Sequence, residues 1–261
     1  MRGTRPLKRW RYIGVFADQL MVCAALVQVG PTRQSFWALL DRTSGELRER
    51  TRLLPRPGEV QLEHADAAGR GRLWIADRGI ELDLVLEEQE GITALCPHGR
   101  YAVWTRKQAG VAAHGTLSVD GGPARPVAGR AVIDDTAGHH ARVTEWFWSA
   151  GVGEGVDGVR VGWNLVSGVN DPPSGSERAV WVDGIPREVP AVAFGEDLTR
   201  VSCAEGSRLC FHAEAERCRR ERLLIVSSEY RAPFGTFSGT LPGGLELRSG
   251  LGVMEHHCAR W

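Results

Sequence analysis

The residues from Val132 to Trp148 hold more side chains able to move protons or stack on a ligand than any other segment of this chain. An acid beside an aromatic wall stays protonated near neutral pH, because apolar burial disfavours the carboxylate. The segment therefore predicts general acid chemistry, or binding of the polar end of an apolar ligand. Its candidate side chains are Asp134, Asp135, His139, His140, Glu145, Trp146 and Trp148.

Asp134 and Asp135 are adjacent, so on a β-strand their side chains point to opposite faces. One of them would face an interior, near Trp146 or Trp148 if the two strands pair. The sequence does not decide which one, since a register change of one residue exchanges the two faces. The alternative is that both acids, with Thr136, form a turn.

The His pair, His139 and His140, could act as a general base or bind a metal. A second group, His256, His257 and Cys258, would allow a site with mixed nitrogen and sulfur ligands. Adjacent His side chains diverge on a strand, and neither group has the spacing of a known zinc motif. We expect exposed or hydrogen-bonded His, with no metal and no cofactor.

Three further residues are candidates for a ligand pocket. Glu255 follows an alternating strand and could point inward, although a surface position is the alternative. Trp163 and Asn164 could line a pocket with a polar edge, although Trp on a strand also serves as core. The Ser residues lack a GxSxG elbow, so the sequence gives no support for a Ser nucleophile.

Composition excludes several classes of partner. The 32 basic and 32 acidic residues balance, so no overall field attracts nucleic acid or an anionic membrane. The six Cys residues form no CxxC pair, which favours reduced thiols and a cytoplasmic location. The apolar run from Leu20 to Val29 is too short to span a membrane and predicts a buried strand.

Many short strands joined by tight turns are expected from 32 Gly, 13 Pro and nine Trp residues. Ile80 to Glu87 alternates apolar and acidic residues, the pattern of a half-buried strand. Asp183-Gly184 suits a type I′ hairpin turn. Leu209 to Ala215 predicts a strand, with a short helix over 213–221 as the alternative.

The segment from Gly121 to Ala128, rich in Gly and Pro, is the expected junction between two domains, residues 1–125 and 126–261. Separate strands are expected before and after it, at 101–107, 115–120, 223–230 and 235–240. Regular spacing of such strands suggests a barrel or a sandwich.

Several long motifs resemble one bacterial family, domain of unknown function 2804. They are DDTAGHHARVTEWFWSAGVG, VGWNLVSGVNDPP, SERAVWVDG, APFGTFSGTLPGG and GVMEHHCARW. The resemblance covers nearly the whole chain, and it implies no established activity.

A more distant likeness is to the carotenoid 1,2-hydratase and AttH-like proteins. The order of WTRKQAGVAAHGTLSVDG, VAGRAVIDD, EWFW, VDGIPREV and GLGVMEHH is similar to their layout. This resemblance implies two lipocalin-like barrels in tandem and an apolar ligand site. Asp134 or Asp135 takes the place of the family's aspartate, and Trp146 and Trp148 that of its W-x-W motif. After the aspartate, this chain has Asp-Thr where those proteins have His-x-Trp.

We therefore predict an all-β protein of two lipocalin-like antiparallel domains that binds a hydrophobic, isoprenoid- or lipid-like molecule. As a lyase or isomerase it would use Asp134 or Asp135 as general acid and His140 as proton relay. Trp146, Trp148 and Trp163 would stack on developing positive charge. The alternative is a non-catalytic carrier whose acids only orient the ligand.

Overall fold

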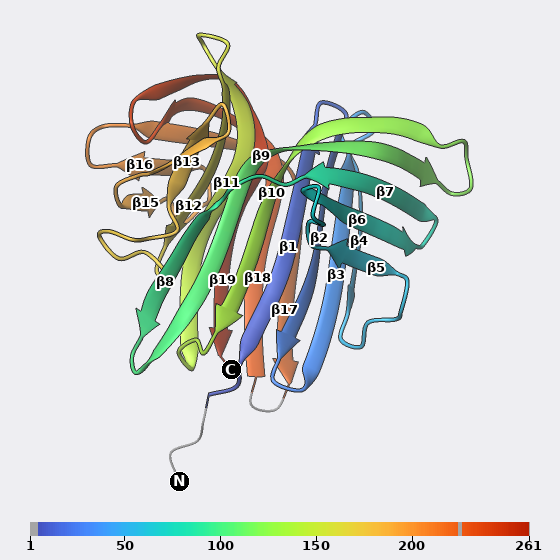
Figure 1. The fold of residues 1–261 in the computed structure, drawn as a ribbon, viewed down its shortest axis with the longest axis horizontal. Helices are drawn as coiled ribbons and strands as arrows, with labels where there is room; N and C mark the ends of the chain where they lie inside the picture. Colours follow the sequence, from blue (N-terminus) through green and yellow to red (C-terminus); the bar gives the residue numbers. More distant parts are fainter. Residues whose placement is uncertain (1–4, 224–225, 261) are drawn as a thin grey trace.

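Two antiparallel sheets lie side by side in the computed structural model, which describes residues 5–223 and 226–260 (Figure 1). The first sheet has the strand order β4-β3-β2-β1-β10-β9-β7-β6-β5, with β8 paired to β9. Its strands are β1 (Lys8–Ala17), β2 (Leu20–Val29), β3 (Thr32–Asp41), β4 (Glu46–Arg52), β5 (Val60–Glu63), β6 (Arg70–Asp77), β7 (Ile80–Glu87), β8 (Ile92–His98), β9 (Tyr101–Val119) and β10 (Arg125–Gly138).

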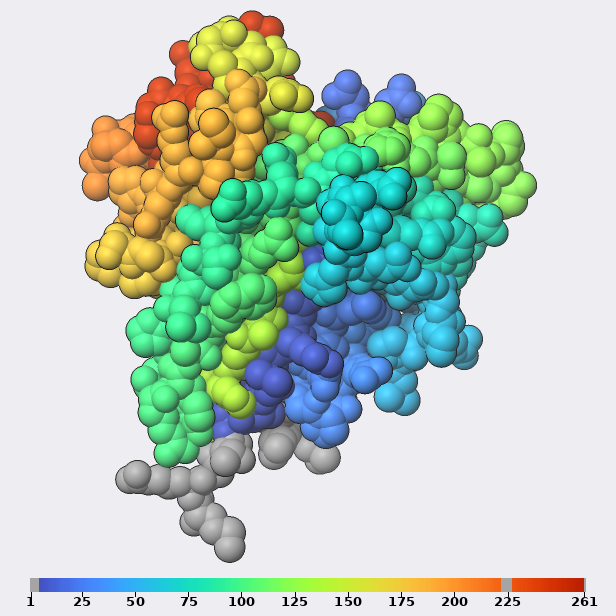
Figure 2. Space-filling model, in the orientation of Figure 1, coloured from blue at the N-terminus to red at the C-terminus, as the bar shows by residue number. Residues whose placement is uncertain are grey.

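The second sheet has the order β14-β13-β12-β11-β19-β18-β17-β16-β15. Its strands are β11 (Val143–Gly155), β12 (Arg160–Ser167), β13 (Ala179–Val182), β14 (Ile185–Glu188), β15 (Val192–Phe194), β16 (Arg200–Cys203), β17 (Arg208–Leu223), β18 (Val226–Leu241) and β19 (Leu245–Arg260). On the face shown in Figure 2, the green residues of β8 and β9 run along the junction between the two halves.

The predicted fold class is confirmed. The described residues form strands and turns without a helix, and the two curled antiparallel sheets correspond to two lipocalin-like halves in tandem. Over the same residues, the chain offers no apolar helix of membrane-spanning length.

Three apolar clusters hold the molecule together, one inside each half and one between them. Ile13 and Val15 of β1 point into the first half, whereas Tyr12 and Phe16 of the same strand point toward the second half. Strand β2 divides its side chains in the same way. Because both faces of these strands are buried, residues 12–17 and 20–27 are apolar at successive positions and lack a period of two. Trp163 lies in the cluster inside the second half.

Several predicted strands are confirmed. Strand β7 has the predicted bounds, and β17 extends over the residues for which a short helix was the alternative. The turn between β13 and β14 has positive φ at both Asp183 (47°) and Gly184 (84°), as a type I′ turn requires.

Other segments differ from the expectation. The strands expected at 101–107 and 115–120 are one long strand, β9, which keeps its pairing to β10 through a β-bulge at Ala131/Val132. Likewise β18 covers most of 223–230 and 235–240 without a break, while residues 224 and 225 lie outside the described residues. The predicted junction, 121–128, holds a turn and the first residues of β10. The chain changes sheets after β10, and the predicted domain boundary between 125 and 126 stays a prediction.

Candidate functional site

A cavity of about 430 Å³ lies between the two halves. It is not inside either half, because each interior is filled by its own apolar cluster. Both sheets therefore contribute a wall. The cavity is lined by Trp10, Tyr12, Ala25, Val27, Val29, Thr32, Arg33, Gln34, Phe36, Thr51, Leu53, Lys107, Asp134, Thr136, His140, Trp146, Trp148, Val166, Val169, Asn170, Glu177, Arg219, Glu221, Ser228, Tyr230, Glu255 and His257.

The first wall is a set of side chains that pair directly across neighbouring strands and so share one face of the sheet. One row across the sheet runs Lys107, Asp134, Tyr12, Ala25, Phe36 and Thr51. The next row runs Thr136, Trp10, Val27 and Gln34. Within these two rows, the charged side chains are Lys107 and Asp134, which lie at the same end.

The second wall is built in the same way from β11, β19, β18 and β17. One row across this sheet runs Trp146, His257, Tyr230 and Arg219. A neighbouring row pairs Trp148 with Glu255. The acid Glu255 therefore lies on the same face as two Trp rings and one His ring.

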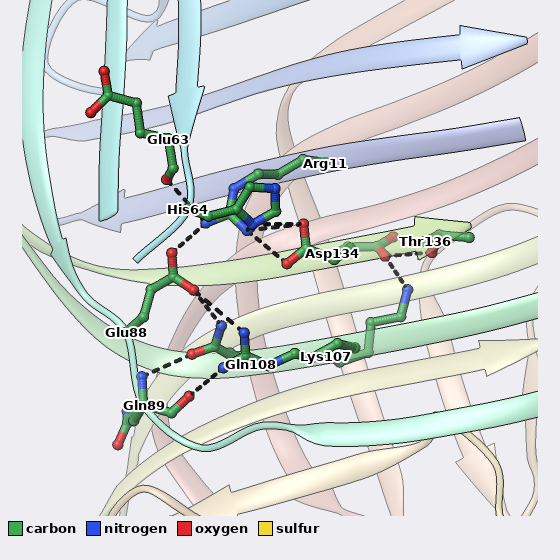
Figure 3. A network of polar contacts seen from close by, with 11 residues as sticks. Arg11, Glu63, His64, Glu88, Gln89, Lys107, Gln108, Asp134 and Thr136 are labelled. Atoms are coloured by element: carbon green, nitrogen blue, oxygen red, sulfur yellow. Dashed lines mark hydrogen bonds and ion pairs between the residues drawn. The ribbon is translucent and has the colours of Figure 1, made fainter. Parts of the chain in front are cut away.

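A buried ion-pair cluster forms the floor of the cavity. The Lys107 ammonium lies 2.6 Å from Asp134 and 3.3 Å from Glu177, which comes from the segment between β12 and β13. Asp134 also accepts hydrogen bonds from the Trp10 indole (3.1 Å) and the Thr136 hydroxyl (2.8 Å). Figure 3 shows Lys107, Asp134 and Thr136 converging.

The charge states of the floor follow from these contacts. Burial alone would lower the pKa of Lys107, but attraction to the two carboxylates outweighs it, and the pKa is raised. Burial raises the pKa of Glu177, and Lys107 opposes this shift in part. Lys107 is therefore a fixed cation at the floor of the cavity.

Asp135 points to the opposite face of β10 and belongs to a different polar network. Figure 3 labels Arg11, Glu88 and Gln108 of this network. It accepts two hydrogen bonds from Arg11, at 2.6 and 2.9 Å, and Arg11 also pairs with Glu88. Gln108 donates to Glu88 at 2.8 Å. This network is buried within the first half, and Asp135 does not line the cavity.

Glu255 is an acid poised to titrate near neutral pH. Burial raises the pKa of Glu255 to about 7, opposed by a hydrogen bond of 2.8 Å from the Trp146 indole and reinforced by the negative charge of Asp134. Its side chain is only 18% exposed. A carboxylic acid in this state can give a proton to a bound ligand at physiological pH.

Two neutral His rings line the cavity. Burial lowers the pKa of His257 to about 3, and burial with the charge of Lys8 lowers that of His140 to about 3. His257 lies 3.8 Å from Glu255 on one side and 2.8 Å from the Ser228 hydroxyl on the other. These groups form a polar chain leading to the acid. His140 packs its ring against Trp10, with the centroids 5.1 Å apart.

The structure brings five of the predicted site residues together around the cavity: Asp134, His140, Trp146, Trp148 and Glu255. Asn164 lies behind the wall, where its side-chain oxygen accepts a hydrogen bond from the Trp148 indole at 2.8 Å. The remaining four, Asp135, His139, Glu145 and Trp163, do not line the cavity. Glu145 is exposed and pairs with His256 at 2.9 Å.

Sequence reasoning missed the residues that complete the site, above all Lys107, Glu177 and Tyr12. Lys107 stands between Arg106 and Gln108 on β9, so no signal in the sequence sets it apart from its neighbours. Glu177 lies on a loop without a pattern, so nothing in the sequence connects it to Asp134. Among the described residues, no three His, Cys, Asp or Glu side chains converge as ligands for a metal ion.

The comparison with protein families assigns the chain. The model for a domain of unknown function (DUF2804) matches residues 70–261. The chain belongs to this family. A search of the curated proteins finds no match to this DUF2804 protein.

Solved structures share the fold of this DUF2804 chain at low sequence identity. An AttH-like protein of Nitrosomonas europaea is 14% identical, with a TM-score of 0.55 over 97% of this chain and 92% of that protein. Kievitone hydratase of Nectria haematococca is 11% identical, with a TM-score of 0.62 over 95% and 88%. CghA is 10% identical, with a TM-score of 0.51 over 98% and 88%. The predicted likeness to AttH-like proteins is thus confirmed at the level of fold.

The buried ion pair between Asp135 and Arg11 predicts a large loss of stability when Asp135 is replaced. We expect Asp135→Asn to lower the free energy of unfolding by about 3 kcal/mol, because it leaves Arg11 in a buried site with incomplete charge compensation. Asp83→Asn is the matched control. It breaks a pair with Arg72 in which both side chains are 39% exposed, and should cost about 1 kcal/mol or less. Urea unfolding of both variants tests this, and equal losses would contradict it.

The raised pKa of Glu255 predicts a pH-dependent stability. The folded protein binds this proton more tightly than the unfolded chain, whose Glu has the ordinary value of 4.5, against about 7 when folded. The contribution to stability is complete below pH 4.5 and is lost as the pH rises through about 7. Glu255→Gln should therefore match the parent at the acid end and exceed it by about 3 kcal/mol at the basic end.

The measurement is urea unfolding of parent and Glu255→Gln across this pH range. Glu145→Gln is the control, since Glu145 is 59% exposed on the neighbouring strand. Its difference from the parent should stay within about 0.5 kcal/mol at every pH. A Glu255→Gln difference that does not change with pH would show that Glu255 is not a raised-pKa acid.

Proposed function

We propose that this protein binds an unsaturated, isoprenoid- or lipid-like molecule between its two halves and transfers a proton to it, as a hydratase or isomerase. The observation that carries the proposal is the placement of Glu255, an acid with a pKa of about 7, in an aromatic-walled cavity of about 430 Å³. A cavity of this size suits a small organic ligand. The fold shared with kievitone hydratase is compatible with this chemistry.

In the proposed reaction, Glu255 gives its proton to one carbon of a double bond, which leaves positive charge on the neighbouring carbon. The π faces of Trp148, Tyr12 and Trp10 stabilise this charge. For hydration, a water molecule adds to the cation and Asp134 accepts the proton that the water loses. For isomerisation, Asp134 removes a proton from the adjacent carbon instead. Either way one proton enters from Glu255 and one leaves to Asp134.

The predicted roles are revised accordingly. Asp134 keeps a catalytic role, as the base, because it is the carboxylate that the first wall places in the cavity. Glu255 takes the role of acid. His140 packs against Trp10, and both His140 and His257 have a pKa lowered to about 3, so neither ring is assigned a proton-relay role.

The alternative is a non-catalytic carrier. It is supported by the contacts of Asp134, whose two oxygens accept hydrogen bonds from Lys107, Trp10 and Thr136. A carboxylate held in this way can orient a ligand without reacting with it.

We also propose a cytoplasmic location, since all six cysteines are free thiols in the structure.

The first experiment is native mass spectrometry of the protein purified from a bacterial host, followed by extraction of any organic adduct. The extracted compound is then incubated with fresh protein in heavy-oxygen water and, separately, in deuterated water. Gain of one labelled water indicates a hydratase, and deuterium uptake without a change in formula indicates an isomerase. Unchanged recovery in both solvents supports the carrier.

For the catalytic form, Glu255→Gln should slow turnover by about a hundredfold or more, the usual contribution of a general acid. Turnover by the parent should also fall as the pH rises above about 7, where Glu255 loses its proton. Glu145→Gln should keep the parent's rate. Full turnover by Glu255→Gln would contradict the assignment of the acid.

A further inference from the structure

The cavity has a buried floor and an exposed rim. At the floor, the Lys107 and Glu177 side chains are 4% and 3% exposed. At the rim, Arg219 is 39% and Leu53 is 43% exposed, and Arg33 is exposed as well. A ligand therefore enters past the rim and extends toward the floor.

The two ends carry opposite charge. The rim holds two guanidinium groups, Arg33 and Arg219, against one carboxylate, Glu221, which accepts from Arg219 at 2.5 Å. Arg33 forms no ion pair with any carboxylate of the described residues. The floor holds two carboxylates around the single Lys107 ammonium, with Glu255 nearby. The rim thus has an excess of positive charge and the floor an excess of negative charge.

The strand register places Arg219 on the face of the second sheet that lines the cavity. Arg219 pairs directly with Tyr230 across β17 and β18, and Tyr230 pairs with His257, so the three side chains share the face that lines the cavity. Between rim and floor the walls are apolar, with Ala25, Val27 and Phe36 facing Trp148 and its neighbours. The path from rim to floor therefore crosses a surface that suits a hydrocarbon chain.

We propose, building on the proposed function, that the ligand is an amphipathic anion. Its carboxylate head group lies at Arg33 and Arg219, and its hydrocarbon chain runs inward toward Lys107. The reverse orientation would bring an anion against the carboxylates of Asp134 and Glu177, which already compensate the Lys107 ammonium. Guanidinium groups match a carboxylate in geometry as well as charge. This orientation brings the middle or far part of the chain to Glu255, away from the head group.

The test uses two fluorescent probes that differ only in the head group, cis-parinaric acid and its methyl ester. Binding is followed by the probe's fluorescence and by energy transfer from the Trp residues of the cavity wall. We expect the parent to bind the acid more tightly than the ester, and added salt to weaken binding of the acid alone.

The Arg33→Gln/Arg219→Gln double variant should raise the Kd of the acid roughly tenfold, the effect of losing two exposed ion pairs, and leave that of the ester unchanged. Arg231→Gln is the matched control, since Arg231 lies on β18 next to Tyr230 but pairs with Glu216 and does not line the cavity. It should change neither Kd.

The outcomes separate this inference from the proposed function. If acid and ester bind equally well and the double variant has no effect on either, the head-group assignment is wrong while an apolar ligand site stands. If neither probe binds, the apolar site on which the proposed function depends is itself contradicted.

Discussion

The ammonium group of Lys107 holds the two halves of the molecule in register at the candidate site. It comes from β9 of the first sheet and lies between Asp134 of the same sheet and Glu177 of the second half. A buried cation needs such partners, because desolvation alone would remove its charge. The same pairing holds the Asp134 side chain at the floor of the cavity. The positions of Asp134 and Glu177 at the floor, and so the place of the proposed base, thus depend on the Lys107 side chain.

The position of the cavity follows from how the strands bury their two faces. In each half, one face of the sheet packs on an interior that is already full, with Trp37 and Trp163 among its largest side chains. The faces that the halves turn toward each other leave the space of the cavity. A lipocalin-like fold suggests a ligand inside a barrel. Here the doubling of the fold creates the site instead, and neither half has both walls of it.

How far the sequence predicts this structure depends on the range of the interactions. The fold class, β7 and the Asp183-Gly184 turn follow from local periodicity and turn chemistry. The choice between Asp134 and Asp135 does not, since it is decided by the pairing of β10 with β1, which sets Tyr12 opposite one acid and Arg11 opposite the other. That contact joins residues more than a hundred positions apart.

The candidate site shows the same limit. Trp146, Trp148 and Glu255 were predicted from alternation within their own strands, and they meet because β11 pairs with β19. Glu177 was not predicted, because its loop has no period and its partner is on the other sheet. Long strands were divided in the prediction where glycines and prolines interrupt the pattern, as at Pro233 and Gly235 in β18. Strand β18 continues through these residues because it pairs with β17 on one side and β19 on the other.

The apolar wall formed by β2 and β3 gives this scaffold a way to change ligand size without changing its chemistry. Ala25 lies between Tyr12 and Phe36 in one row across the sheet, on the cavity side, and it is the smallest side chain there. The groups that bear protons come from other strands. Substitution of such a residue by a larger or a smaller one would change the length of hydrocarbon chain that the cavity accepts. Divergence in specificity could then proceed on two strands while the acid and the base stay as they are.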